Sequence, residues 1–173
     1  MRQNFTLKRA LFAVFSFILL VLLDQWTKSL AVKHLMNHEP FILIPNVFQL
    51  RYLENRGAAF GMLQGQQTFF VVIATVALAF ISYAYFKLPW KKRFHYLRII
   101  GLMIGAGAVG NLIDRIALGY VVDFFYFELI DFPIFNVADI YVTVATFVLA
   151  ALIIFYYKEE ELDAVFSKKK ENK

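Results

Sequence analysis

The chain has 173 residues, of which 60% are hydrophobic and 18% aromatic, and its mean hydropathy is +0.59; these values are typical of an integral membrane protein and exclude an ordinary soluble domain. It has no cysteine, which excludes a disulfide framework, a thiolate metal site and a cysteine nucleophile. The net charge of +5 arises from short basic flanks beside apolar runs, so it predicts membrane orientation and no nucleic-acid partner.

The first apolar run follows Arg2, Lys8 and Arg9 and predicts a transmembrane helix over residues 10–32. A removable signal peptide is the alternative, because residues 29–31 imitate a small-x-small cleavage site. However, the helical pattern continues for roughly 20 residues, which is about the length that crosses the hydrocarbon core. We therefore interpret it as a membrane-spanning helix.

Residues 40–60 predict a small extracytoplasmic β-sheet. Pro40 and Pro45 interrupt any helix, and Phe48, Leu50 and Tyr52 alternate with polar residues at the period of a strand. The segment ends in the stretch 54–61, whose glycines permit close backbone approach.

Three further apolar runs predict transmembrane helices over residues 68–87, 98–115 and 135–157. A basic loop joins the first two, and Gly101 and Gly105 have the four-residue spacing that favours tight helix contact. Residues 120–133 predict an aromatic interfacial loop or short helix, and residues 158–173 a charged, mobile tail. The fold class is thus an all-α membrane protein of four transmembrane helices with a small β-sheet, in a single domain over residues 1–173.

The distribution of cations predicts the orientation. Most of the 18 lysines and arginines lie in the two termini and the middle loop, so we place both termini in the cytoplasm. Nearly all polar residues that are awkward in a membrane then collect at the extracytoplasmic end: Asp24, Lys28, Asn55, Asn111, Asp114, Arg115, Asp123, Asn136 and Asp139. Ionisable groups at membrane depth usually line a site, so this clustering predicts one functional site.

Asp24 and Lys28 have the i, i+4 spacing of a helical ion pair, and Asn111 shares a helix face with Asp114 and Arg115. Structural helix-end networks and direct contact with substrate both explain these two patterns. An arginine near lipid is costly unless a carboxylate accompanies it.

Asp123 and Asp139 each have apolar neighbours and no adjacent cation. Such surroundings raise a carboxyl pKa, and two adjacent carboxylates can share one proton, so that one serves as acid and the other as base. Spacing alone leaves three interpretations open: a catalytic dyad, a cation-binding or proton-coupled site, and a structural role.

No pattern in the sequence indicates a metal or a cofactor. His34, His38 and His95 form no ligand cluster. Binding of Mg²⁺ or Ca²⁺ by the aspartates alone stays open as an alternative, but their spacing is not that of a dedicated loop. The sequence also lacks G-x-S-x-G, H-E-x-x-H and phosphate-binding glycine motifs.

Five ordered blocks between residues 24 and 139 resemble one known family, the bacterial lipoprotein signal peptidases or signal peptidase II. The blocks are Asp24-Gln25-Trp26-Thr27-Lys28, Asn55-Arg56-Gly57-Ala58-Ala59-Phe60, Gly110-Asn111-Leu112-Ile113-Asp114-Arg115, Val121-Val122-Asp123-Phe124 and Phe135-Asn136-Val137-Ala138-Asp139. The resemblance implies a four-helix aspartic endopeptidase of the cytoplasmic membrane that cleaves diacylglyceryl-modified prolipoproteins before the lipidated cysteine and is inhibited by globomycin.

Carried over by motif, the resemblance makes Asp123 and Asp139 the catalytic residues. It implies substrate-binding or supporting roles for Asp24, Lys28, Asn55, Gly57, Asn111, Asp114, Arg115 and Asn136, with no metal and no cofactor. We expect a monomer in contact with membrane lipid. A small ion-coupled carrier with carboxylates in its site, and an assembly factor whose polar cluster only packs helices, are the alternatives.

Overall fold

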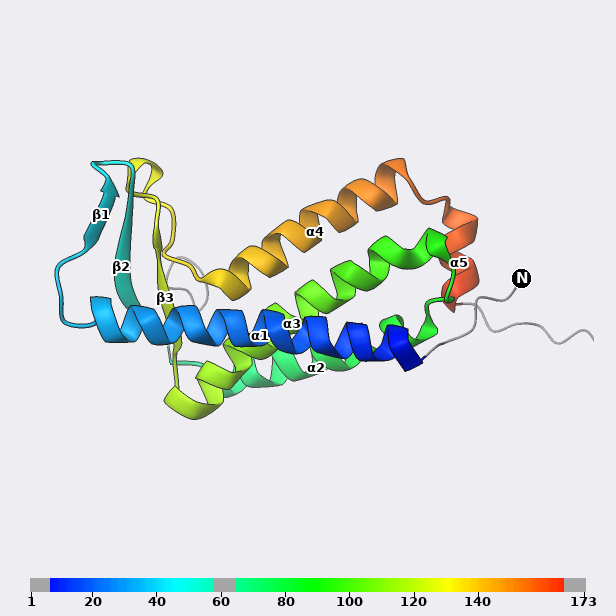
Figure 1. Cartoon of the computed structure of the whole chain (residues 1–173), viewed down its shortest axis with the longest axis horizontal. Coiled ribbons are helices and arrows are strands. Elements are labelled where there is room, and N and C mark those ends of the chain that lie inside the picture. The colour runs from blue at the N-terminus through cyan, green and yellow to red at the C-terminus, as the bar shows by residue number, and fades with distance from the viewer. Residues whose placement is uncertain (1–6, 58–64, 167–173) are drawn as a thin grey trace, which may run out of the picture.

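The computed structural model describes residues 7–57 and 65–166. Its principal elements in chain order are α1 (Leu7–Leu35), β1 (Phe41–Ile44), β2 (Phe48–Asn55), α2 (Gln67–Lys87), α3 (His95–Leu118), β3 (Val121–Tyr126), α4 (Val137–Phe155) and α5 (Glu159–Phe166). Short 3₁₀ helices, η2 (Lys92–Phe94) and η3 (Glu128–Ile130), precede α3 and follow β3. The helices form an elongated bundle with the sheet at one end and α5 at the other (Figure 1). The predicted block residues Ala58, Ala59 and Phe60, and Gly61 beyond them, lie outside the described residues.

Three of the described helical segments are long and apolar enough to cross a bilayer: Gln67–Lys87, Lys92–Leu118 and Val137–Phe155. They correspond to the predicted spans over residues 68–87, 98–115 and 135–157, so the protein is mostly helical and multi-pass. The predicted first span forms the 29-residue helix α1, which is not among these three.

Helix α3 is the centre of the bundle, since α1, α2 and α4 all pack against it. A Cβ atom at Gly107 would lie 2.5 Å from the carbonyl oxygen of Ala138 on α4, and one at Gly110 would meet the Asp24 carboxylate on α1. At Gly101, by contrast, the nearest atom would be 3.5 Å away. A Cβ atom at Gly105 would lie 3.3 Å from Phe17 of α1, which is a tight contact. Of the pair that the four-residue spacing favoured, Gly105 is therefore at a tight helix contact and Gly101 is not, while the closest contacts are at Gly107 and Gly110.

The three strands form an antiparallel sheet in the order β1-β2-β3. The prediction of a sheet is confirmed, but β3 occupies part of what we expected to be an aromatic loop. Residues 121–124 are all buried, so this strand lacks the alternation of apolar and polar residues that identifies a one-sided strand. Val122 and Phe124 pack with Ala31 and Leu35 of α1, which fixes the sheet to the end of the bundle.

The expectation of a mobile tail from residue 158 is wrong for its first half. Residues 159–166 form α5, in which Leu162 and Val165 lie one helical turn apart and pack against the cluster of Leu88, Phe94 and Tyr157. A spacing of three residues between two apolar side chains is a weak signal in so short a segment. Residues 167–173 lie outside the described part of the chain.

Candidate functional site

The first turn of α4 fixes the position of Asp139. Asn136 is the N-cap: its side-chain oxygen accepts a hydrogen bond from the Asp139 backbone N–H at 3.0 Å, and its own backbone N–H donates to Asp139 Oδ2 at 3.2 Å. This reciprocal capping box satisfies two backbone donors at the helix start and restricts the Asp139 carboxylate to one orientation. The other oxygen, Oδ1, accepts from Asn111 Nδ2 on α3 at 2.8 Å.

Strand β3 supplies Asp123, whose side chain is buried, with 1% exposure. Asn55, at the end of the neighbouring strand β2, donates from Nδ2 to Asp123 Oδ2 at 2.9 Å. Asn136 Nδ2 donates to Asp123 Oδ1 at 2.6 Å. Both carboxylate oxygens are therefore held by amide groups from different elements.

Asn136 connects the two carboxylates. Its side-chain amide donates to Asp123 and its backbone N–H donates to Asp139. One residue thus bridges two carboxylates that are sixteen residues apart in the sequence. Burial, and after it the negative charge of Asp139, raise the pKa of Asp123 from 3.8 to about 7, although the hydrogen bonds from Asn55 and Asn136 oppose the shift. A carboxyl group with such a pKa can carry a proton at neutral pH.

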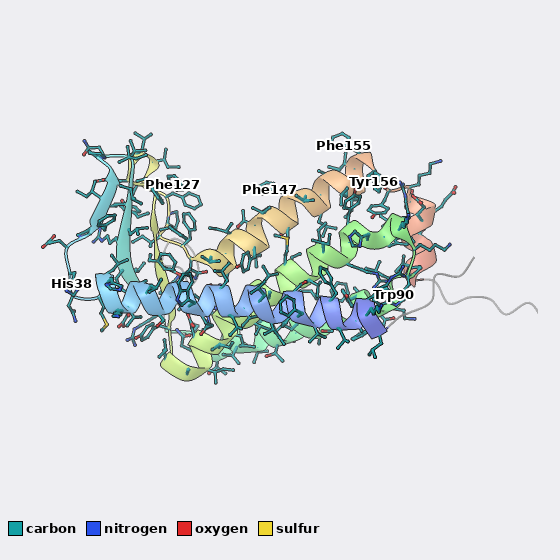
Figure 2. The ribbon with its side chains drawn as sticks, viewed as in Figure 1. His38, Trp90, Phe127, Phe147, Phe155 and Tyr156 are labelled. Carbon is teal, nitrogen blue, oxygen red and sulfur yellow. The ribbon has the colours of Figure 1, made fainter. Side chains whose placement is uncertain are left out.

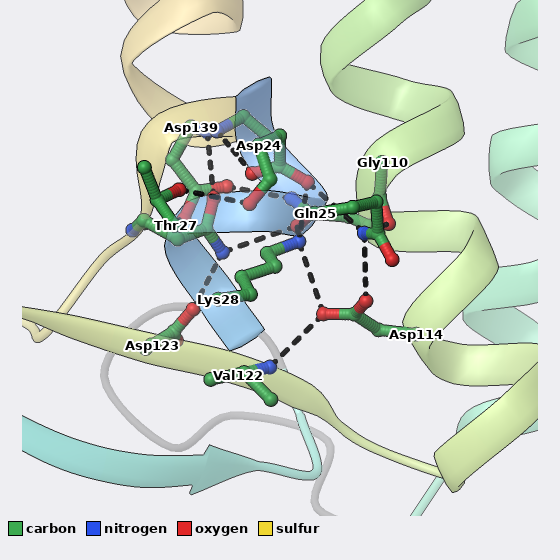
Figure 3. Close-up of polar contacts among 12 residues, drawn as sticks. Asp24, Gln25, Thr27, Lys28, Gly110, Asp114, Val122, Asp123 and Asp139 are labelled. Atoms are coloured by element: carbon green, nitrogen blue, oxygen red, sulfur yellow. Dashed lines mark hydrogen bonds and ion pairs between the residues drawn. The ribbon is translucent and has the colours of Figure 1, made fainter. Parts of the chain in front are cut away.

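Lys28 is the centre of a buried charge cluster beside this pair. Its ammonium group lies 2.9 Å from Asp24 Oδ2 and 3.0 Å from Asp114 Oδ2, and it donates to Asn111 Oδ1 at 2.8 Å. Figure 3 shows Lys28 between Asp24 and Asp114. The helical ion pair of Asp24 and Lys28 that the spacing indicated is thus present. Asn111 links the charge cluster to the carboxylate pair, because its Nδ2 also donates to Asp139 Oδ1.

The carboxylates of this cluster also bind backbone groups of the two elements that carry the acids. Asp24 Oδ1 accepts from the Ala138 N–H at the start of α4, at 2.9 Å, and Asp114 Oδ2 accepts from the Val122 N–H of β3, at 3.1 Å (Figure 3). The cluster therefore positions the residues immediately before Asp139 and Asp123.

Gln25 is a site residue that the sequence reasoning did not select. Its Nε2 donates to Asp114 Oδ1 at 2.9 Å and to the Gly110 carbonyl at 3.1 Å, which joins α1 to α3. Its position next to Asp24 in the first block was the feature of the sequence that could have identified it. We selected polar residues by charge and by helical spacing, and an uncharged glutamine met neither criterion.

Arg115 does not pair with a carboxylate within the described residues, contrary to the expectation from its cost near lipid. Its Nη2 atom donates to the Gly57 carbonyl at 3.5 Å, its Nη1 atom donates to the Asn111 carbonyl at 3.4 Å, and its guanidinium lies 5.0 Å from the centroid of the Phe70 ring. Its Nε is buried and has no hydrogen-bond partner in the part of the chain that the structure describes. Gly57 is held in turn, because its N–H donates to Asn55 Oδ1 at 3.0 Å. These residues form one edge of the site.

The site as a whole brings together all ten residues selected from the sequence. Its donors are amides, backbone N–H groups, one ammonium and the Arg115 guanidinium, and most of them contact carboxylates. Within the described residues, no group of three or more His, Cys, Asp and Glu side chains is arranged to hold a metal ion. The arrangement is suited to proton transfer between carboxyl groups, one of which has a pKa near neutrality.

Comparisons with known proteins agree on one family. Residues 16–155 match the family described as signal peptidase (SPase) II. A lipoprotein signal peptidase of Caldanaerobacter subterraneus subsp. tengcongensis is 48% identical over 136 residues, which cover 78% of this chain and 90% of that protein. A lipoprotein signal peptidase of Streptococcus pyogenes serotype M5 is 43% identical over 155 residues, which cover 90% of this chain and 98% of that protein.

The fold has a counterpart among solved structures. A bacterial membrane enzyme determined by the in meso method matches with a TM-score of 0.74 and 28% sequence identity, over 100% of this chain and 99% of that one.

Proposed function

The chain belongs to the signal peptidase II family, and we propose that Asp123 and Asp139 are the catalytic pair with which this protease removes signal peptides from prolipoproteins. One observation carries the assignment: Asn136 donates a hydrogen bond to each of the two carboxylates, one of which is buried with a pKa of about 7. Aspartic peptidases use two carboxyl groups that share a proton.

The proposed reaction assigns one role to each carboxyl group. The ionised one takes a proton from a water molecule as that water attacks the scissile carbonyl, and the protonated one donates to the carbonyl oxygen. The tetrahedral intermediate then collapses, the peptide C–N bond breaks, and the amine leaves with a proton from the pair. A water molecule is consumed and the two carboxyl groups return to their starting protonation.

Asp139 is the proposed ionised member of the resting pair. Its carboxylate lies at the N-terminus of α4, where the helix dipole and a backbone N–H favour negative charge. Asp123, by contrast, is a buried residue within strand β3 rather than in the first turn of a helix. Because the two groups interact, their titration belongs to the pair. The Nε of Arg115, which has no hydrogen-bond partner among the described residues, would steady the oxyanion. Asn136 has no spare donor for this, because its Nδ2 already donates to both Asn111 Oδ1 and Asp123 Oδ1.

The proposed substrate is a prolipoprotein that carries diacylglycerol on the cysteine after the scissile bond, and a globomycin-type inhibitor would occupy the same site. Large apolar side chains beside this end of the bundle are exposed, among them Phe69, Val72 and Ile140, and would contact the acyl chains. We expect a monomer to suffice, since every selected residue comes from one chain. An ion-coupled carrier is not favoured, because the family is one of proteases.

The proposed topology has four spans in one domain over residues 1–173, with α1 as the first. Leu11, Phe15, Ile18 and Leu22 of α1 are exposed apolar side chains that would face lipid. By the positive-inside rule, the cations of the α5 end support a cytoplasmic location for that end, with the carboxylate site at the outer leaflet. A reporter fused after Lys92 should report a cytoplasmic location, and an extracytoplasmic signal would refute this orientation.

Cleavage of a diacylglyceryl-modified prolipoprotein by the purified protein in detergent tests the pair. We expect Asp123→Asn and Asp139→Asn each to lower the rate by about 10²–10⁴-fold, because each removes one proton-transfer group. Asp131→Asn is the matched control: this exposed aspartate lies at φ 46°, a conformation that asparagine tolerates, so the parental rate should remain. Parental activity in either of the first two variants would disprove the assignment.

A further inference from the structure

The end of the bundle opposite the carboxylate site has a cavity of about 890 Å³ between the first turns of α1 and the start of α3. Trp90 and Tyr156, which line it, lie near α5 in Figure 2. No Asp or Glu of the described residues lines the cavity. Six cationic side chains do: Lys8, Arg9, Lys91, Lys92, Arg93 and Arg98. Such an excess of one charge attracts an anionic ligand.

Two of these cations are already engaged. Arg98 is buried, donates to the Leu88 carbonyl at 2.5 Å, and has its guanidinium 3.7 Å from the centroid of the Trp90 ring. Arg93 forms an ion pair with Glu161 at 2.9 Å.

The other four cations are available to a ligand. Lys8, Arg9, Lys91 and Lys92 are exposed and form no ion pair with any described residue. Positive-inside placement explains why cations lie at this end. It does not explain why cations from α1 and from the α2–α3 connection line one cavity.

An apolar cavity of about 510 Å³ continues from the cationic one, sharing Ala13, Tyr85, Trp90 and Leu102 with it. It lies between α1 and α2, which both pack against α3, and no charged residue of the described chain lines it. Gly101 and Gly105 form part of its wall. The two cavities together have the form of a polar head site that opens into an apolar groove.

We propose that this end of the bundle binds one anionic phospholipid of the surrounding leaflet. Its phosphate group would lie among the four exposed cations, and an acyl chain would lie along the groove between α1 and α2. A soluble phosphate would use only the cationic part, and a zwitterionic lipid would bring its own ammonium group against the cations. The orientation of this end toward the cytoplasm rests on the proposed topology, whereas lipid binding itself does not depend on peptidase activity.

Trp90 lines both cavities and can report occupancy directly. The chain has two tryptophans, and Trp26 is 60% exposed on α1, so Trp26→Phe leaves Trp90 as the single reporter. Phosphatidylglycerol brominated on its acyl chains is titrated into detergent micelles of the full chain, and brominated phosphatidylcholine in a parallel series. We expect half-maximal quenching at a mole fraction of the anionic lipid about tenfold lower, as two or more cations near a phosphate would give.

Matched variants separate the two parts of the site. Arg9→Gln with Lys92→Gln should abolish the preference for the anionic lipid, whereas Lys33→Gln with Arg51→Gln, an exposed pair away from the cavity, should retain it. Ala13→Phe, which fills the junction of the cavities, should weaken quenching by both lipids, and Ala151→Phe on the exposed face of α4 should not.

Three results would overturn the proposal: equal midpoints for the two lipids in the parent, equal loss of preference in the two cation pairs, or full displacement of the lipid by soluble glycerol phosphate. The readout is Trp90 fluorescence in the absence of prolipoprotein substrate and requires no cleavage. Each of these three results is therefore distinguishable from a failure of the peptidase assignment.

Discussion

The two ends of the helical bundle hold charge in opposite ways. At the sheet end, the side chains of Asp24, Lys28 and Asp114 are at most 4% exposed and contact one another. At the α5 end, the ion pair of Arg93 and Glu161 has side chains that are 35% and 31% exposed. Exposed pairs contribute little to stability, while a buried charge that loses its partner is strongly destabilising. The buried cluster is thus better explained by the positions it fixes than by the stability it adds.

Among the substitutions that compare the two ends, replacement of Lys28 should lower the free energy of unfolding most. Lys28→Met leaves two buried carboxylates without their cation, and we expect the free energy of unfolding to fall by about 3–5 kcal/mol. The measurement is denaturant unfolding of the protein in mixed micelles.

The control for Lys28 is the corresponding change at the other end. Arg93→Met breaks the half-exposed pair with Glu161, and the loss in the free energy of unfolding should be much smaller than that of Lys28→Met. If the two substitutions cost the same, burial does not distinguish the two ends in the way argued above.

The glycines of α3 offer a second comparison between the ends. Gly107→Ala would place a methyl group 2.5 Å from the Ala138 carbonyl oxygen and 2.7 Å from Val142 Cγ2, so that α4 must move. Overpacking of this kind costs about 1–3 kcal/mol. Since Ala138 adjoins Asp139, cleavage should fall as well.

Gly101→Ala serves as the control because its methyl group meets Tyr85 only at 3.5 Å, an ordinary contact. Unfolding in micelles and the cleavage rate should both remain near the parental values. Equal losses at Gly101 and Gly107 would contradict the assignment of the close helix contact to the sheet end.

The position of the site could be predicted from the sequence because hydrocarbon excludes charge. Once the apolar runs were placed, Asp24, Asp114 and Asp139 had to lie at one end, and that end is where the structure gathers them. Blocks of local sequence then identified the amide residues, such as Asn136, whose hydrogen bonds satisfy the carboxylates.

The features that could not be predicted depend on contacts between distant segments. Strand β3 is buried on both faces because α1 covers it, so its sequence has no alternation. Gln25 matters only because α3 brings Asp114 and the Gly110 carbonyl within reach. Gly107 lies against the Ala138 carbonyl of α4, whereas Gly101 lies against the Tyr85 side chain of α2.

The smallest expected effect concerns pH and belongs to the sheet end alone. The pKa of Asp123 is raised to about 7, so Asp123 is protonated below that pH and loses its proton above it. Activity that needs one shared proton should therefore decline above pH 7, and kcat/KM measured against pH should show an alkaline limb there.

Asn55→Ala should move this limb to higher pH. Asn55 donates to Asp123 Oδ2 at 2.9 Å and thereby favours the ionised form, so its loss raises the pKa of Asp123 further. We expect the rate at pH 8 relative to that at pH 6 to rise roughly two- to threefold, since a tenfold change needs a full pKa unit. Gln66→Ala, which truncates an exposed amide with no capping bond at the start of α2, should leave the profile unchanged. A limb that moves to lower pH in Asn55→Ala would mean that water entering the space solvates the Asp123 carboxylate more strongly than the amide does. In that event burial, and not the pair of amide donors, controls the proton on Asp123.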